Sequence, residues 1–224
     1  MTRFKICCIA DEVEAALAVR YGASCLGLVA QMPSGPGPIP DADIARIRRT
    51  IPPGVASFLL TCRQSADDII AHVRMTGCNT IQICDRLTSG SYGAIREALP
   101  GVSIVQVIHV TGEESFVEAA ELAPQVDAIL LDSGRPNQAV KELGGTGRVH
   151  DWSVSRKIRE SIEKPVFLAG GLNPGNAVEA IRAVAPYALD ICSGVRTKGK
   201  LDEQKLAAFV AAIRAADTDA VPLR

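Results

Sequence analysis

The chain has 224 residues, of which 47% are hydrophobic and 22% charged, and its 24 basic and 25 acidic side chains give a formal net charge of -1. This length accommodates one large domain or two small ones and is enough to bury a substantial core. The near-neutral balance excludes the electrostatic footprint of a nucleic-acid-binding protein. Because the apolar runs are too short to cross a bilayer and the first residues lack the features of a signal peptide, we expect a soluble, cytoplasmic protein without membrane contacts.

The seven cysteines do not form the pattern of a disulfide framework. Their number is odd, and Cys25, Cys84 and Cys192 lie inside apolar runs, as small hydrophobic residues do. A reducing compartment fits this usage. The sequence also has no CxxC or HExxH motif and only three histidines, far apart, so we predict no metal site.

Short apolar runs rich in β-branched residues alternate with longer segments of helical period along the whole chain. Eight strands are predicted, at Phe4–Cys7, Cys25–Val29, Val55–Leu60, Thr80–Cys84, Ser103–Val110, Ala128–Leu131, Val166–Leu168 and Leu189–Cys192. Eight helices are predicted, at Glu12–Tyr21, Asp41–Thr50, Ala66–Thr76, Tyr92–Leu99, Glu114–Leu122, Ser153–Ile162, Asn176–Val184 and Asp202–Ala215.

Strands that alternate with helices of this length indicate a parallel sheet with helical crossovers. Eight such units predict a single-domain α/β fold, a (β/α)8 TIM barrel over residues 1–216, with a frayed tail at 217–224. The alternative is a doubly wound open sheet. A dinucleotide-binding sheet of that kind would carry GxGxxG after its first strand, where this chain has Cys8-Ile9-Ala10.

Two glycine-bearing segments follow the last two predicted strands. Gly170-Gly171 comes after the seventh strand and Ser193-Gly194 after the eighth. In such barrels these two loops commonly bind phosphate, because glycine lets backbone N–H groups approach an anion. The alternative is that the glycines only form tight turns. A third segment, Gly144–Gly147, we interpret as a rim loop that covers a substrate.

Cys7 ends the first predicted strand and Asp132 follows the sixth. An unpaired buried carboxylate is costly, so Asp132 is expected to face the mouth of the barrel. Cys7 on its own is also compatible with an inert core thiol. Together across the mouth, the two suggest a general base and a general acid, with Lys5 as the cation that favours the thiolate.

These motifs, in this order and spacing, resemble those of the phosphoribosylanthranilate isomerase family over nearly the whole chain. The segments that carry the resemblance are Lys5-Ile6-Cys7, Leu130-Leu131-Asp132, Gly144-Gly145-Thr146-Gly147 with Asp151-Trp152, Leu168-Ala169-Gly170-Gly171-Leu172-Asn173-Pro174 and Ser193-Gly194-Val195.

The resemblance implies an Amadori rearrangement, without cofactor or metal, in tryptophan biosynthesis. N-(5-phosphoribosyl)anthranilate, an aminoaldose, would become 1-(2-carboxyphenylamino)-1-deoxyribulose 5-phosphate, an aminoketose. By this analogy Asp132 is the general acid that protonates the furanose oxygen, and Cys7 is the general base that removes the proton from C2. The phosphate ligands would be Gly170, Gly171, Ser193 and Gly194.

Several positions depart from the family pattern, mostly around the aryl end of the substrate. The family loop after the second strand carries an arginine that pairs with the anthranilate carboxylate, but Pro33–Pro38 contains none. Cys8 stands where the family has glycine, and Arg196 where it has glutamate. The fourth strand runs into Gln82-Ile83-Cys84-Asp85-Arg86 instead of the usual Gln-Leu-His-Gly. Further candidates for substrate contacts are Lys5, Gln82, Arg86, His109, Gly145 and Arg148, with Arg135 as a third possible replacement for the arginine.

The leading hypothesis is therefore an isomerase of the phosphoribosylanthranilate type, which acts on a small phosphosugar. Two rivals remain, namely a related isomerase for another amino-substituted ribose phosphate, and a barrel that binds phosphosugars without catalysis. The sequence leaves the oligomeric state open.

Overall fold

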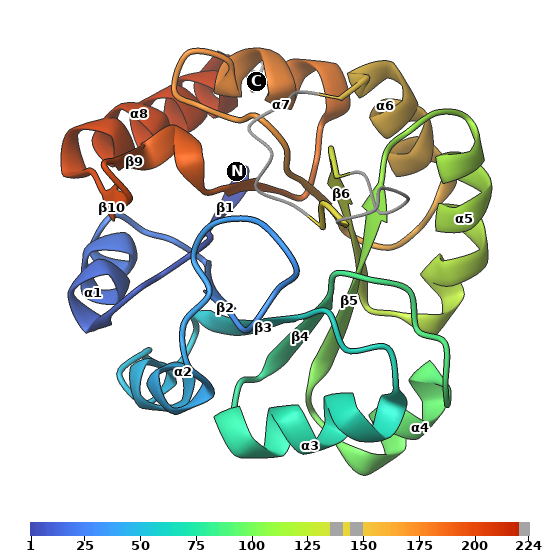
Figure 1. Ribbon diagram of the computed structural model, residues 1–224. Coiled ribbons are helices and arrows are strands. Elements are labelled where there is room, and N and C mark those ends of the chain that lie inside the picture. Colours follow the sequence, from blue (N-terminus) through green and yellow to red (C-terminus); the bar gives the residue numbers. More distant parts are fainter. Residues whose placement is uncertain (135–140, 144–149, 220–224) are drawn as a thin grey trace.

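The computed structural model describes residues 1–134, 141–143 and 150–219, and eight parallel strands close into a barrel (Figure 1). Each strand pairs with the next along the chain, and the last pairs with the first, so the predicted (β/α)8 barrel is confirmed and the open sheet is excluded. The strands are β1 (Arg3–Ile6), β2 (Cys25–Val29), β3 (Ala56–Thr61), β4 (Thr80–Ile83), β5 (Ser103–His109), β6 (Ala128–Asp132), β7 (Val166–Leu168) and β8 (Ala188–Ile191).

The helices surround the barrel and connect successive strands (Figure 1). The Asp11 carboxylate accepts a hydrogen bond from the backbone N–H of Glu14 at 2.8 Å and begins the first helix. The helices are α1 (Glu12–Arg20), α2 (Asp41–Arg48), α3 (Ala66–Thr76), α4 (Tyr92–Ala98), α5 (Glu114–Leu122), α6 (Trp152–Ser161), α7 (Ala177–Val184) and α8 (Glu203–Asp219), with short 3-10 turns η1 (Ala123–Gln125) and η2 (Ser193–Val195).

Both faces of the sheet are buried, which explains why the strands show no alternation of apolar and polar residues. In β6, Leu130 packs inside the barrel, whereas Ile129 and Leu131 belong to the apolar layer between the sheet and the helices. Phe58 and Phe167 fill the barrel interior, with ring centroids 5.6 Å apart.

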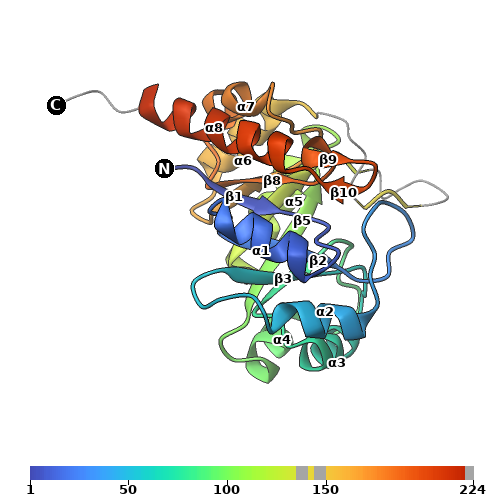
Figure 2. The same cartoon turned by 90° about the vertical axis from the view of Figure 1, so that its left-hand side faces the viewer.

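The carboxyl ends of the eight strands lie together at one end of the barrel. At this end the loop between β2 and α2, drawn in blue, passes over the barrel axis in Figure 1 and projects beyond the strands in Figure 2. The N-terminus lies toward the other end of the barrel. Cys7, Asp132 and the glycine segments that follow β7 and β8 are thereby brought to one rim.

Two features differ from the sequence-based expectation. A small hairpin, β9 (Arg196–Thr197) with β10 (Lys200–Leu201), was not predicted; its turn places Lys198 at φ 52 and Gly199 at φ 80, as a tight two-residue turn requires. At the other end of the chain, α8 continues to Asp219, beyond the expected limit at residue 216. The Asp217 carboxylate accepts hydrogen bonds from the backbone N–H of Thr2 at 2.8 Å and from its hydroxyl at 2.8 Å, so the ordered chain passes the predicted start of the frayed tail.

Candidate active site

One cavity at the carboxyl ends of the strands collects most of the candidate residues. Its lining includes Cys7 after β1, Asp132 at the end of β6, Gly170 and Gly171 after β7, and Ser193 after β8. The thiol, the carboxyl group and the two phosphate-loop candidates therefore share one space, although they lie up to 186 positions apart in the sequence (193 minus 7).

Asp132 is suited to carry a proton. Burial raises the pKa of its carboxyl group, although the hydrogen bond from the Ser133 backbone and the nearby His109 oppose this shift. The Ser133 N–H donates to Asp132 Oδ1 at 2.7 Å and fixes the side chain at the end of β6. A carboxyl group with a raised pKa is a competent general acid near neutral pH.

Cys7 lies beside a buried ion pair. The pairing of β1 with β8 places Lys5 opposite Asp190, and Lys5 Nζ lies 2.8 Å from Asp190 Oδ2. Lys5 is fully buried, which by itself lowers its pKa, but the attraction of Asp190 and of the Cys7 thiolate outweighs this and raises it, so Lys5 remains a cation. Lys5 therefore holds a fixed positive charge beside Cys7.

A glycine in β2 makes room for this arrangement. A Cβ atom on Gly27 would lie 3.0 Å from Cys7 Sγ and 3.1 Å from Lys5 Cε. Any larger residue at this position would press on both the thiol and the lysine stem.

The loops after β7 and β8 pack directly on each other. Gly170 and Gly171 have φ angles of 85 and 64, in the left-handed region where glycine is favoured. A Cβ on Gly194 would lie 2.0 Å from the Leu172 carbonyl oxygen, so Gly194 joins the two loops but does not line the cavity. Ser193 begins the turn η2 at the cavity wall.

Part of the cavity lining is apolar. Met32, Leu60 and Leu143 belong to it, which is the environment expected around an aryl ring. Two polar side chains, Ser34 and Gln82, also line the cavity. The Ser34 hydroxyl donates to the Lys141 carbonyl at 2.6 Å, and Gln82 is buried with no partner for its Oε1 among the described residues.

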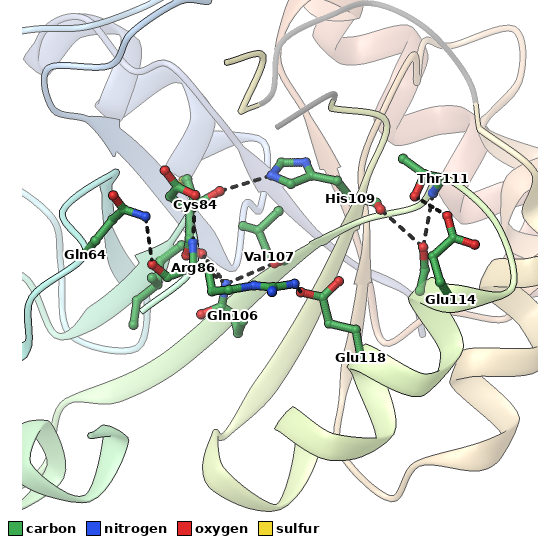
Figure 3. Close-up of polar contacts among 12 residues, drawn as sticks. Gln64, Cys84, Arg86, Gln106, Val107, His109, Thr111, Glu114 and Glu118 are labelled. Carbon is green, nitrogen blue, oxygen red and sulfur yellow. Dashed lines mark hydrogen bonds and ion pairs between the residues drawn. The ribbon is translucent and has the colours of Figure 1, made fainter. Parts of the chain in front are cut away.

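Neither Arg86 nor His109 belongs to the lining of this cavity. Figure 3 shows the partners that they have instead, Glu118 for Arg86 and Cys84 for His109. Arg86 is mostly exposed and pairs with Glu118 at 3.0 Å. His109 lies beside Asp132 in the sheet, but its Nε2 is bonded to the Cys84 carbonyl at 3.1 Å. Gly145, Arg148 and Arg135 lie outside the described residues, as does the segment Gly144–Gly147.

Sequence reasoning missed Asp190, which lines the cavity and holds Lys5. The signal was visible, because a carboxylate within the apolar run of β8 is as unusual as Asp132 in β6. The partners of Arg196 were also missed. Its guanidinium forms an ion pair with Glu14 at 2.9 Å and donates to the carbonyl oxygens of Cys7, at 3.2 Å, and of Cys8.

Two kinds of feature are absent from the described part of the chain. None of its helices combines the length and the apolar character needed to span a membrane. No group of three or more His, Cys, Asp or Glu side chains there is arranged to hold a metal ion.

Comparison with known proteins places this geometry in a family. The family model for N-(5'-phosphoribosyl)anthranilate (PRA) isomerase matches residues 5–212. The chain belongs to the PRA isomerase family. It is 36% identical to the Haloferax volcanii PRA isomerase over 218 residues, covering 96% of this chain and 95% of the relative. With the Methanocella arvoryzae PRA isomerase it is 37% identical, covering 96% and 99%.

Solved structures of PRA isomerases share the fold. The enzyme from Thermotoga maritima superimposes with a TM-score of 0.79 at 27% identity, covering 96% of this chain and all of the other. A PRA isomerase in complex with reduced 1-(o-carboxyphenylamino)-1-deoxyribulose 5-phosphate superimposes with a TM-score of 0.76 at 25% identity, with the same coverage. The PRA isomerase fold thus extends over nearly the whole chain.

Proposed function

We propose that this chain isomerises N-(5'-phosphoribosyl)anthranilate, with Asp132 as general acid and Cys7 as general base. The observation that carries the proposal is that both groups line one cavity together with Gly170, Gly171 and Ser193. This is the combination that an aminoaldose phosphate requires, namely an acid, a base and an anion site.

The reaction begins with two proton transfers, one to the furanose ring oxygen and one from C2. Asp132 gives its proton to the furanose ring oxygen, the C1–O bond breaks, and the anomeric nitrogen supplies the electron pair that forms a protonated imine. The imine acidifies the C2–H bond, so that the Cys7 thiolate can remove this proton. The enolamine then gains a proton at C1 and loses the proton of its C2 hydroxyl group, which gives the ketone. Family membership, the raised pKa of Asp132 and the Lys5 charge near Cys7 support these roles.

The phosphate is assigned to the rim formed by the loops after β7 and β8. Gly170 and Gly171 line the cavity there, where the absence of a side chain lets backbone N–H groups approach an anion, and Ser193 and Gly194 continue the same rim. The aryl group would then lie against Met32, Leu60 and Leu143, with Gln82 as the nearest buried polar side chain.

The same chemistry on another amino-substituted ribose phosphate is the second candidate. It is favoured by the apolar lining and by the lack of an arginine in the loop Pro33–Pro38. A substrate without a carboxylate on its aryl or amine group would need no arginine. The seven free thiols support a cytoplasmic location for either reaction.

The test follows the loss of fluorescence of phosphoribosylanthranilate with purified protein. Cys7→Ala and Asp132→Asn are each expected to lower kcat at least about a hundredfold, the usual contribution of a general acid or base. Matched controls are Cys78→Ala, a buried thiol outside the cavity, and Asp127→Asn, at the other end of β6. Retained activity in the Cys7 and Asp132 variants would refute the assignment. The wild-type protein could also show no turnover of phosphoribosylanthranilate while ribose 5-phosphate still stabilises it against heat. That result would favour the second substrate class.

A further inference from the structure

Three cysteine side chains lie together on one wall of the active-site cavity. Cys7, Cys8 and Cys192 all contribute to the lining. The pairing of β1 with β8 brings them together, since Ile6 is in register with Ile191. Cys8 Sγ lies 3.9 Å from Cys7 Sγ, and the thiols of Cys8 and Cys192 are close enough for each to shift the pKa of the other. The proposed base Cys7 is therefore flanked by a second pair of thiols.

Cys8 occupies a backbone position that favours glycine. Its φ angle is 62, in the left-handed region where a side chain carries an energetic cost. The side chain fills the space beneath the loop after β2: a Cβ on Gly37 would lie 2.5 Å from Cys8 Cβ, and the Cys8 thiol donates to the Pro36 carbonyl at 3.5 Å. Cys8 thus connects this loop to the cavity wall.

Arg196 provides a positive charge at the same place. Its guanidinium is hydrogen-bonded to the Cys8 carbonyl and held by Glu14. The neighbouring Cys8 thiol lowers the pKa of the Cys192 thiol, and the Arg196 charge acts in the same direction against the effect of burial. A partly exposed thiol next to a cation is the kind that reacts with oxidants.

We propose that Cys8 and Cys192 form a reversible disulfide at the edge of the active site, and that its formation switches the isomerase off. The two residues that complete this arrangement, Cys8 and Arg196, are the positions where the chain departs from the glycine and glutamate of the family pattern. The disulfide is independent of the reaction assigned above, whereas its effect on turnover rests on the proposed function.

The oxidant is a hydroperoxide. The Cys192 thiolate attacks the outer peroxide oxygen, the O–O bond breaks, and an alcohol or water leaves with a proton, so that Cys192 becomes a sulfenic acid. The Cys8 thiol then attacks this sulfur and displaces water. In total two thiols lose two electrons and two protons, and the peroxide is reduced. A cellular thiol restores the pair by exchange.

Oxidation removes the S–H group that Cys8 donates to Pro36, and it ties β1 to the segment that begins at Ser193. The cavity would lose both its loop contact and the freedom of the phosphate rim. Because Cys7 precedes Cys8 directly, its thiol would move with the new bond.

The first test is the covalent bond itself. Wild-type protein is treated with hydrogen peroxide, alkylated, digested with trypsin without reductant and analysed by mass spectrometry. The expected product joins residues 6–20 to residues 183–196 and has lost two hydrogen atoms. It should persist in Cys7→Ala and be absent in Cys8→Gly and Cys192→Ser, with far-ultraviolet circular dichroism confirming that each variant folds. A link that survives in Cys8→Gly, or no link in oxidised wild-type protein, would overturn the proposal.

The second test compares turnover before and after oxidation. Wild-type turnover should fall at least about tenfold and return with dithiothreitol, while the ratio of oxidised to reduced turnover should stay near one in Cys192→Ser. An equal loss in Cys192→Ser, or a disulfide that leaves turnover unchanged, would refute the switch. Absence of turnover in the reduced wild-type protein would refute the proposed function, and the cross-link would still decide whether the disulfide forms.

Discussion

Replacing Lys5 by methionine tests the ion pair beneath the active site. The Lys5 side chain is fully buried and the Asp190 side chain is 6% exposed. Their charged atoms are 2.8 Å apart. Methionine fills a similar volume but leaves Asp190 without its counter-ion. Breaking a buried pair in this way costs about 3–5 kcal/mol, which is a large part of the roughly 5–15 kcal/mol by which a domain is stable.

The assay is urea unfolding followed by circular dichroism. With a slope of about 3 kcal/mol per molar urea, Lys5→Met should lower the unfolding midpoint by about 1–1.7 M. The double variant Lys5→Met/Asp190→Leu removes both charges and should recover most of the loss, because an apolar pair of similar volume replaces a buried ion pair without penalty. Turnover should stay low in the double variant, since neither variant has the Lys5 cation beside the Cys7 thiol.

Two results would refute this reasoning. A loss of less than about 1 kcal/mol for Lys5→Met would show that Asp190 is not confined as the structure has it. A double variant no more stable than the single one would show that packing, and not the unpaired carboxylate, sets the cost.

Three further predictions concern other parts of the chain. Burial lowers the pKa of His150 from 6.5 to about 4, so the unfolded chain binds the proton first and the free energy of unfolding should fall by about 2 kcal/mol between pH 8 and pH 5. The urea midpoint should fall less over this range in His150→Gln than in the wild-type protein. An equal fall in both would contradict the assignment. Gly194→Ala should weaken phosphate-dependent heat stabilisation and raise KM, because the new Cβ would meet the Leu172 carbonyl at 2.0 Å; unchanged values would show that the two loops separate freely. Asp217→Ala should lower the free energy of unfolding by about 1–3 kcal/mol through loss of its hydrogen bonds to Thr2, and no change would place the end of the ordered chain at residue 216, as the sequence suggested.

The barrel was predictable because its evidence is local and repeated. Each strand is an apolar run and each helix has its own period, and the predicted strands match the observed ones to within one residue at nearly every end. Asp132 is a small exception: it was placed after its strand but forms the last residue of β6. The hairpin Arg196–Leu201 was missed because its turn is Lys198-Gly199, and lysine does not indicate a turn with left-handed backbone angles as asparagine or glycine does.

The site was predictable only in part, for a physical reason. Residues at the carboxyl ends of parallel strands meet whatever their distance in sequence, so Cys7, Asp132 and the glycine loops could be grouped in advance. The direction of a long side chain on the rim is not set by strand register. It depends on which partner lies within reach, and in the structure Arg86 pairs with Glu118 on α5 instead of facing the cavity.

The departures from the family pattern at Cys8 and Arg196 are related in the structure, although the sequence alone does not show it. Taken separately along the sequence, one is a thiol in place of glycine and the other a reversed charge. In the closed barrel they touch, because β1 and β8 are neighbours and the Arg196 guanidinium reaches the Cys8 carbonyl while Glu14 balances its charge. The reversal of charge at Arg196 is therefore tolerated by an acidic partner on α1, and the same cation faces the thiols of Cys8 and Cys192. Two changes that look independent in sequence thus act on one feature, the chemistry of the thiols beside Cys7.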